Sequence, residues 1–123
     1  MTRRVRMTTP HDEFLIELND TNTAEAIWNA LPFDAYTNIW GEEIYFEIPV
    51  KMKLERGKKV MEIGEVAYWP DGNALCLFYG PTPISSDDSP VAISPVTPVG
   101  RVLGDPKNLR RVGDRMKVTL DRA

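Results

Sequence analysis

The segment 66–79 contains two short apolar runs separated by the turn Pro70-Asp71-Gly72-Asn73. Proline presets φ in such a turn, and glycine accepts the φ > 0 that a tight reversal needs. Two apolar runs joined in this way predict a hairpin of adjacent strands. Both faces of the second run, 74–79, are largely apolar, so we expect the hairpin to be central and its Cys76 to be buried.

A second clear pattern is the alternation of residues 42–48. Ile44, Phe46 and Ile48 share one face of the expected strand, which is its core face. The opposite face carries Glu43 and Tyr45. Further strands are expected at 3–8, 13–18, 33–40, 99–103 and 116–120, with a single helical turn at 106–111.

One amphipathic helix is expected after the first hairpin. Asn22 or Thr23 can cap it, and Pro32 ends it. Its apolar stripe consists of Ala24, Ile27, Trp28 and Leu31. A stripe of this width predicts a helix that covers one end of a sheet or barrel.

Residues 80–98 hold five of the ten prolines, together with serines and aspartates. Proline donates no hydrogen bond to a strand ladder, which excludes a central strand on this reasoning. We therefore expect an exposed connection, with 81–95 as the most mobile internal segment.

Composition excludes several classes of protein. The 123 residues fit one domain, 1–123, and the single Cys76 and single His11 supply neither a disulfide nor a structural zinc site. The longest apolar run has six residues, against about 20 for a membrane span. Without a signal peptide either, the chain is expected to be cytoplasmic, to bind no membrane, and to carry no metal or cofactor.

Charge is unevenly distributed. Residues 12–47 contain nine carboxylates and no lysine or arginine, whereas 101–123 contain seven basic and three acidic side chains. An acidic first third disfavours nucleic acid as a partner. The plainest interpretation is that the two regions pair with each other in the fold.

Three motifs prompt a family resemblance: WGEEIYF at 40–46, GEVAYWP at 64–70 and GNALCLFYGPTP at 72–83. Together they resemble the small stand-alone cyclophilin-like proteins of bacteria and archaea, a domain of unknown function. The resemblance spans nearly the whole chain. It implies a mainly β fold, a closed cyclophilin-like β-barrel of about eight strands with one capping α-helix.

True cyclophilins are peptidyl-prolyl isomerases, which lower a barrier of about 18–20 kcal/mol. Those enzymes carry their arginine in a Phe-His-Arg motif. Here the only histidine, His11, is followed by Asp12. The sequence therefore gives no support for isomerase activity.

Three hypotheses for function remain. The first is a binding module for a peptide or small molecule, in a groove where strand 42–48 meets the hairpin 66–79. Its candidate residues are Trp40, Glu42, Glu43, Tyr45, Tyr68, Trp69 and Phe78. With two glutamates and no nearby cation, such a groove should prefer neutral or cationic ligands to phosphates or carboxylates. The alternative for the same residues is that the rings are core and the motif only shapes a bend.

The second hypothesis is an enzyme that uses paired carboxylates. Glu42 and Glu43 are adjacent, so in a strand they point to opposite faces and do not form an acid/base pair with each other. The third hypothesis is an accessory subunit or interaction protein, with a protein partner. Cyclophilin-like barrels also occur in oxoprolinase and allophanate-processing systems, and a lone domain without a nucleophile constellation fits such a role.

Overall fold

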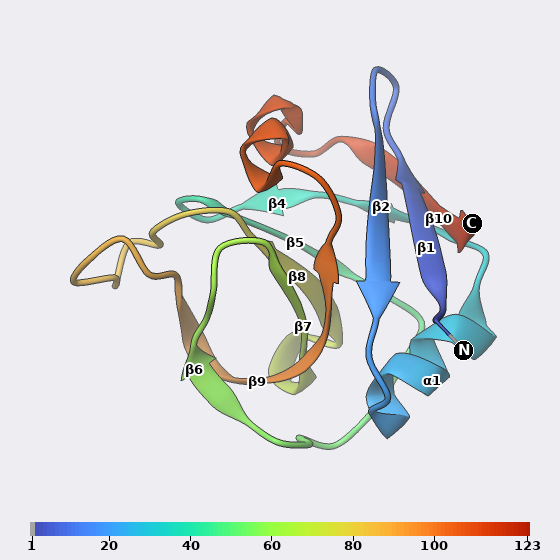
Figure 1. Cartoon of the computed structure of the whole chain (residues 1–123), viewed down its shortest axis with the longest axis horizontal. Helices are drawn as coiled ribbons and strands as arrows, with labels where there is room; N and C mark the ends of the chain where they lie inside the picture. The colour runs from blue at the N-terminus through green and yellow to red at the C-terminus, as the bar shows by residue number, and fades with distance from the viewer. Residues whose placement is uncertain (1) are drawn as a thin grey trace.

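The computed structural model describes residues 2–123, and over that range the chain forms ten strands, one α-helix and two short 3-10 helices (Figure 1). The first half contains β1 (Arg4–Thr8), β2 (Glu13–Leu18), α1 (Asn22–Ala30), β3 (Phe33–Tyr36), β4 (Asn38–Ile39) and β5 (Glu43–Glu47). The second half contains β6 (Lys58–Val60), β7 (Glu65–Trp69), η1 (Pro70–Gly72), β8 (Ala74–Phe78), β9 (Val91–Val102), η2 (Pro106–Arg111) and β10 (Lys117–Arg122). None of the described helices has the length and apolar character to cross a membrane.

All strand pairs are antiparallel, and the sheet order is β3-β10-β1-β2-β9-β7-β8-β5-β4, with β6 also pairing with β9. The two end strands, β3 and β4, are consecutive in the chain and separated by Thr37 alone. The sheet therefore curls round on itself, so that its two end strands come together at Thr37 (Figure 1). The fold is mainly β, as expected. Within 2–123 no strand ladder joins β3 to β4, so closure of the barrel stays a prediction.

The predicted helix is present, but its cap is Thr21 rather than Asn22 or Thr23. The hydroxyl oxygen of Thr21 accepts a hydrogen bond from the Ala24 N–H at 3.0 Å. Asn22 and Thr23 instead donate their backbone N–H groups to the Glu55 carboxylate, at 3.1 and 3.0 Å. A carboxylate supplied by a distant loop satisfies the free N–H groups of the first turn, which the local sequence could not reveal.

The central hairpin is confirmed: β7 pairs with β8, and β8 pairs with β5 on its other side. Every residue of β8 is buried, Cys76 included. Side chains on the two faces of β8 enter different hydrophobic clusters. Leu75 and Leu77 join the main core, whereas Cys76 and Phe78 join a smaller cluster with Ala67, Ala92 and Val96.

The prediction for residues 80–98 is wrong in its second half. From Val91 onward the chain forms β9, a long strand that pairs with β2, β6 and β7 in the middle of the sheet and contains Pro95 and Pro98. The ladders of β9 with β6 and with β7 both shift register. Such irregular positions accept a proline, because no N–H is needed there.

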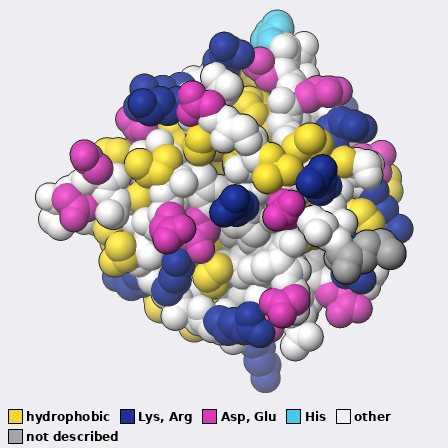
Figure 2. All heavy atoms as spheres, viewed as in Figure 1, with side chains coloured by type: hydrophobic (Ala, Val, Ile, Leu, Met, Phe, Trp, Pro, Cys, Tyr) yellow, Lys and Arg dark blue, Asp and Glu magenta, His cyan; other side chains and the backbone are white. Residues whose placement is uncertain are grey.

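Charges of both signs are interspersed on the face shown in Figure 2. Three ion pairs join the acidic segment 12–47 to the basic segment 101–123: Asp12–Arg111 at 3.3 Å, Asp34–Lys117 at 3.6 Å and Glu42–Arg110 at 3.2 Å. These contacts support the plain interpretation of the uneven charge. Each is a surface pair, worth about 1 kcal/mol or less.

Candidate functional site

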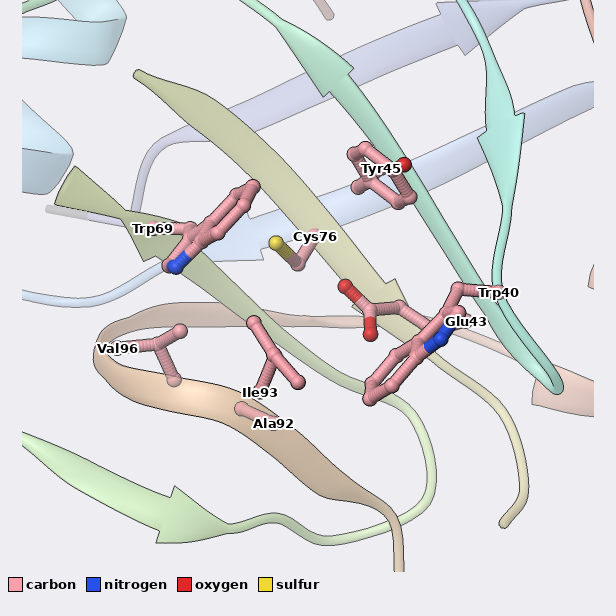
Figure 3. Close-up of a pocket in the computed structure, with 8 residues that line it drawn as sticks. All are labelled: Trp40, Glu43, Tyr45, Trp69, Cys76, Ala92, Ile93 and Val96. Atoms are coloured by element: carbon pink, nitrogen blue, oxygen red, sulfur yellow. The ribbon is translucent and has the colours of Figure 1, made fainter. Parts of the chain in front are cut away.

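A pocket of about 160 Å³ opens where β5, β7 and β8 face the first half of β9 (Figure 3). Trp40 follows β4, Glu43 and Tyr45 lie on β5, and Trp69 and Cys76 lie on β7 and β8. The remaining lining residues, all on β9, are Ala92, Ile93 and Val96. Four of the seven predicted site residues are thus brought together: Trp40, Glu43, Tyr45 and Trp69.

Strand register explains why these side chains meet. Tyr45 lies opposite Cys76 in the β5–β8 ladder. Because directly opposed residues of a sheet point to the same face, the Tyr45 ring and the Cys76 thiol share one side. Glu43 is two residues before Tyr45 and joins them. The alternate residues, Ile44 and Phe46, are fully buried in the main core on the other side.

A tight turn places Trp40 beside Glu43. The two residues exchange backbone hydrogen bonds, with N···O distances of 3.0 and 3.1 Å. Between them, Gly41 has φ +60°, and a Cβ there would lie 2.7 Å from a Pro83 side-chain carbon. Glycine is required on both counts. The motif therefore shapes a bend, as one interpretation had it, and in doing so brings an aromatic ring to a carboxyl group.

Two aromatic rings form adjacent walls. The rings of Tyr45 and Trp69 are edge to face, with centroids 6.1 Å apart and planes at 84°. The Trp69 indole N–H donates to the Ser94 hydroxyl at 2.7 Å, and that hydroxyl donates to Asp71 at 3.0 Å. Since its one polar hydrogen is already bonded, Trp69 offers the pocket only its π surface.

Glu43 is the polar group of the pocket, and it is only 5% exposed. Burial raises the pKa of Glu43 from 4.5 to about 7, while a hydrogen bond with the Cys76 thiol opposes that rise. Burial, together with the charge and the hydrogen bond of Glu43, raises the pKa of Cys76 well above its ordinary value. The thiol is thus inert near neutral pH. None of the lining residues described is a lysine, arginine or histidine.

Glu42 is separated from Glu43 despite being adjacent in sequence. Its carboxylate accepts from Arg110 Nη2 at 3.2 and 3.4 Å, on the surface. The two carboxyl groups therefore do not share a site, in line with the expectation from strand alternation. Glu42 was a candidate ligand contact, and the structure instead gives it a partner within the chain.

Two other candidates do not line the pocket. Tyr68 is fully buried on the main-core face of β7, where its hydroxyl donates to the Val50 carbonyl at 2.6 Å and accepts from the Met52 N–H. Placing Tyr68 and Trp69 on one surface contradicts the alternation of a strand. Phe78 is fully buried in the small cluster that contains Cys76.

Sequence reasoning missed Ala92, Ile93 and Val96 as site residues, because the segment that carries them was expected to be a loop. The available signal was the β-branched content of 91–102, which the prolines outweighed in the prediction. Cys76 was expected to be buried on one face of β8, and the strand register gives that face to the pocket.

Residues 2–123 contain no group of three or more histidine, cysteine, aspartate or glutamate side chains that could hold a metal ion. The pocket also lacks an arginine among its described lining residues, whereas prolyl isomerisation by a cyclophilin uses one. The chemistry of this pocket is thus that of three aromatic rings, one carboxyl group, one thiol and aliphatic walls.

A curled antiparallel sheet with one helix over its end defines a mainly β class of protein. Within that class, the sequence model described as cyclophilin-like matches residues 3–121, and the chain belongs to this family. It is similar to a hypothetical protein from Archaeoglobus fulgidus with a solution structure, at 38% identity and a TM-score of 0.83. The alignment covers 99% of this chain and 95% of the other. No curated protein matches the chain.

Proposed function

We propose that the protein binds a small organic molecule in the pocket formed by Trp40, Glu43, Tyr45 and Trp69. The observation that carries this proposal is the burial of the Glu43 carboxyl in an aromatic pocket whose described lining residues include no lysine, arginine or histidine. Burying a carboxyl without a charge partner costs free energy, and a glutamine would fill the same space more cheaply. Such a cost is characteristic of a ligand-binding or catalytic site and not of a group that only supports the fold.

The dimensions favour a small molecule over a peptide. A cavity of about 150 Å³ can hold a benzene molecule, so a pocket of about 160 Å³ suits one compact group. The Ser94 hydrogen bond holds the Trp69 ring, and the turn at Gly41 fixes the backbone that carries Trp40, before any ligand arrives. Rings held in place in advance lower the ordering cost of binding.

Tryptophan signals provide a direct test, because the chain contains three tryptophans and only Trp40 and Trp69 line the pocket. We would titrate ¹⁵N-labelled protein with choline, 3,3-dimethylbutan-1-ol, phenol and N-acetylprolinamide. At least one probe should shift the Trp40 and Trp69 indole N–H signals saturably at millimolar concentration. Trp28, in α1, should not respond.

The variant Ala92→Leu should abolish that response, because it fills the pocket without removing a ring. Ala26→Leu, which adds the same side chain on the half-buried face of α1, is the matched control and should bind like the unmodified protein. The proposal fails if none of the four probes shifts Trp40 and Trp69 saturably.

A further inference from the structure

We propose that the ligand carries a small methylated ammonium group, which the rings of Trp40, Tyr45 and Trp69 surround and the Glu43 carboxylate neutralises. This inference rests on the proposed ligand-binding function and specifies its ligand class. The expected ligand is a free small molecule, because the pocket matches one such head group in volume.

The rings are suited to a cation. A cation is attracted to the face of an aromatic ring within about 6 Å of its centroid, most strongly for tryptophan. Three of the eight lining residues are aromatic, and two are tryptophans. Tyr45 and Trp69 stand nearly perpendicular, so together they enclose a group from two directions (Figure 3).

The remaining walls favour methyl groups over a bare ammonium. Ala92, Ile93 and Val96 offer only aliphatic carbon on the β9 side. A primary ammonium needs three hydrogen-bond acceptors, whereas a fully methylated one needs none. Trp69 brings no free polar group, since its N–H is bonded to Ser94. A methylated ammonium group therefore gives up fewer hydrogen bonds than a primary ammonium when it moves from water into this pocket.

The charge of the pocket has one sign. On β5, Glu43 and Tyr45 are the ionisable groups of the pocket, and β8 contributes only Cys76, which stays a neutral thiol. β4 carries no charged residue, and the described β9 lining is apolar. Two other acids on these segments already have partners: Glu42 is paired with Arg110, and Asp71 accepts from the Ser94 hydroxyl.

An anionic ligand would face this carboxylate with no compensating cation. A neutral ligand would leave the carboxylate desolvated and unpaired, which is the costly state. A cationic ligand would instead form an ion pair with the buried Glu43 carboxylate, in a pocket of low polarity. The ionised form of Glu43, whose pKa lies near 7, is then favoured on binding.

Three compounds of nearly one shape separate charge from size: choline, 3,3-dimethylbutan-1-ol and 3,3-dimethylbutanoate. At pH 8, where Glu43 is mostly ionised, choline should bind at least about tenfold more tightly than the alcohol, and the anion most weakly. The readout is the shift of the Trp40 and Trp69 indole signals, with Trp28 as internal reference. Equal binding of choline and the alcohol overturns the cation assignment and leaves the proposed function standing. If these compounds, phenol and N-acetylprolinamide all fail to shift the two signals, both proposals are overturned.

The variant Glu43→Gln should abolish the preference for choline and keep the binding of the alcohol. Glu42→Gln is the matched control and should keep the preference, because Glu42 lies outside the pocket. If Glu43→Gln does not fold, the unmodified protein at pH 5.5 gives the same comparison. The affinity for choline should fall there by about tenfold, while the affinity for the alcohol stays the same or rises. A preference for choline that survives both changes contradicts the role of Glu43.

One further probe tests the source of the ammonium group. A peptide containing trimethyllysine should bind no more tightly than choline, since only its head group would enter the pocket. Tighter binding of the peptide overturns the assignment to a free small molecule.

Discussion

Trp28 and Trp69 are both half-buried tryptophans, but their electrostatic surroundings are opposite. The guanidinium carbons of Arg3 and Arg122 lie 5.7 and 4.7 Å from the centroid of the Trp28 ring. Trp69 instead shares a pocket with Glu43 and no cation of the described chain. The fold supplies cations to the first ring and an acid to the second. An external cation is therefore expected at the second.

The two regions also differ in what they contribute to stability. The contacts at Trp28 stabilise the fold modestly, because each exposed cation–π contact is worth about 0.5–1 kcal/mol. Burial of Glu43 acts in the other direction whenever the group is ionised. We infer that burial of Glu43 lowers the stability of the fold in favour of the proposed ligand binding.

The largest expected effect tests whether Tyr45 belongs to an open pocket. Phe46 is its neighbour on β5 but is fully buried in the main core. Phe46→Ala should lower the free energy of unfolding by about 3–5 kcal/mol, through lost burial and a new cavity. Tyr45→Ala should cost about 1–2 kcal/mol in the same denaturant titration, because the ring is already partly exposed. A loss of about 3–5 kcal/mol for Tyr45→Ala would show that Tyr45 is a core residue. The pocket would then lack one of its rings, and its contrast with the Trp28 region would no longer hold.

The second effect concerns the pH dependence of stability. The folded protein holds the Glu43 proton up to about pH 7, whereas the unfolded chain releases it near 4.5. The stabilisation from that proton is complete below the lower value and is lost as the pH rises through the higher one. Glu43→Gln keeps a neutral group at all pH values. It should match the unmodified protein at pH 4 and be more stable at pH 8, by up to about 3 kcal/mol.

Thermal and denaturant unfolding of Glu43→Gln across that pH range provides the measurement. Glu42→Gln is the control, because the Glu42 side chain is 32% exposed and already paired with Arg110. It should change stability by no more than about 1 kcal/mol at any pH. A Glu43→Gln variant that is equally destabilised at both pH values would show that the carboxyl is needed by the fold.

The third effect compares the two tryptophans directly in binding. Trp69→Ala should weaken choline binding by about 10- to 30-fold, since it removes one ring of the pocket. Trp28→Ala should change it less than about twofold, because Trp28 lies outside the pocket. Isothermal titration at pH 8 separates the two. Equal losses would mean that the effect comes from general destabilisation.

The smallest effect concerns the cations at Trp28. Arg122→Gln removes a guanidinium from that ring and a hydrogen bond to the Trp28 carbonyl at 3.2 Å. It should lower stability by about 1 kcal/mol or less, because the side chain is exposed. Choline binding should stay unchanged in the same variant. A change in choline binding would show that the Trp28 region and the pocket are coupled.

Much of the local structure could be predicted from the sequence. The Pro-Asp-Gly turn predicted the β7–β8 hairpin, and the alternation of β5 put Ile44 and Phe46 in the core, with Tyr45 on the other face. These features depend on neighbours in the chain, so a local pattern carries them. The same alternation, applied to β7, would have excluded Tyr68 from the pocket.

The burial of Glu43 could not be predicted, because it depends on contacts between distant segments. Alternation placed Glu43 on the polar face of its strand, and nothing local showed that Ala92 and Val96 would cover that face. β9 brings this cover, and the prolines of β9 had predicted a loop. The sheet order, in which β9 lies between β2 and β7, is likewise absent from any local pattern.

The most direct test of the account is the pKa of Glu43 itself, followed by its ¹³C carboxyl signal in an NMR titration with and without saturating choline. We predict a pKa of about 7 for Glu43 in the free protein, set by burial. With choline bound, this pKa should fall by at least about one unit, because the cation favours the ionised form. A free-protein pKa near 4.5, or a raised pKa that choline leaves unchanged, would contradict it.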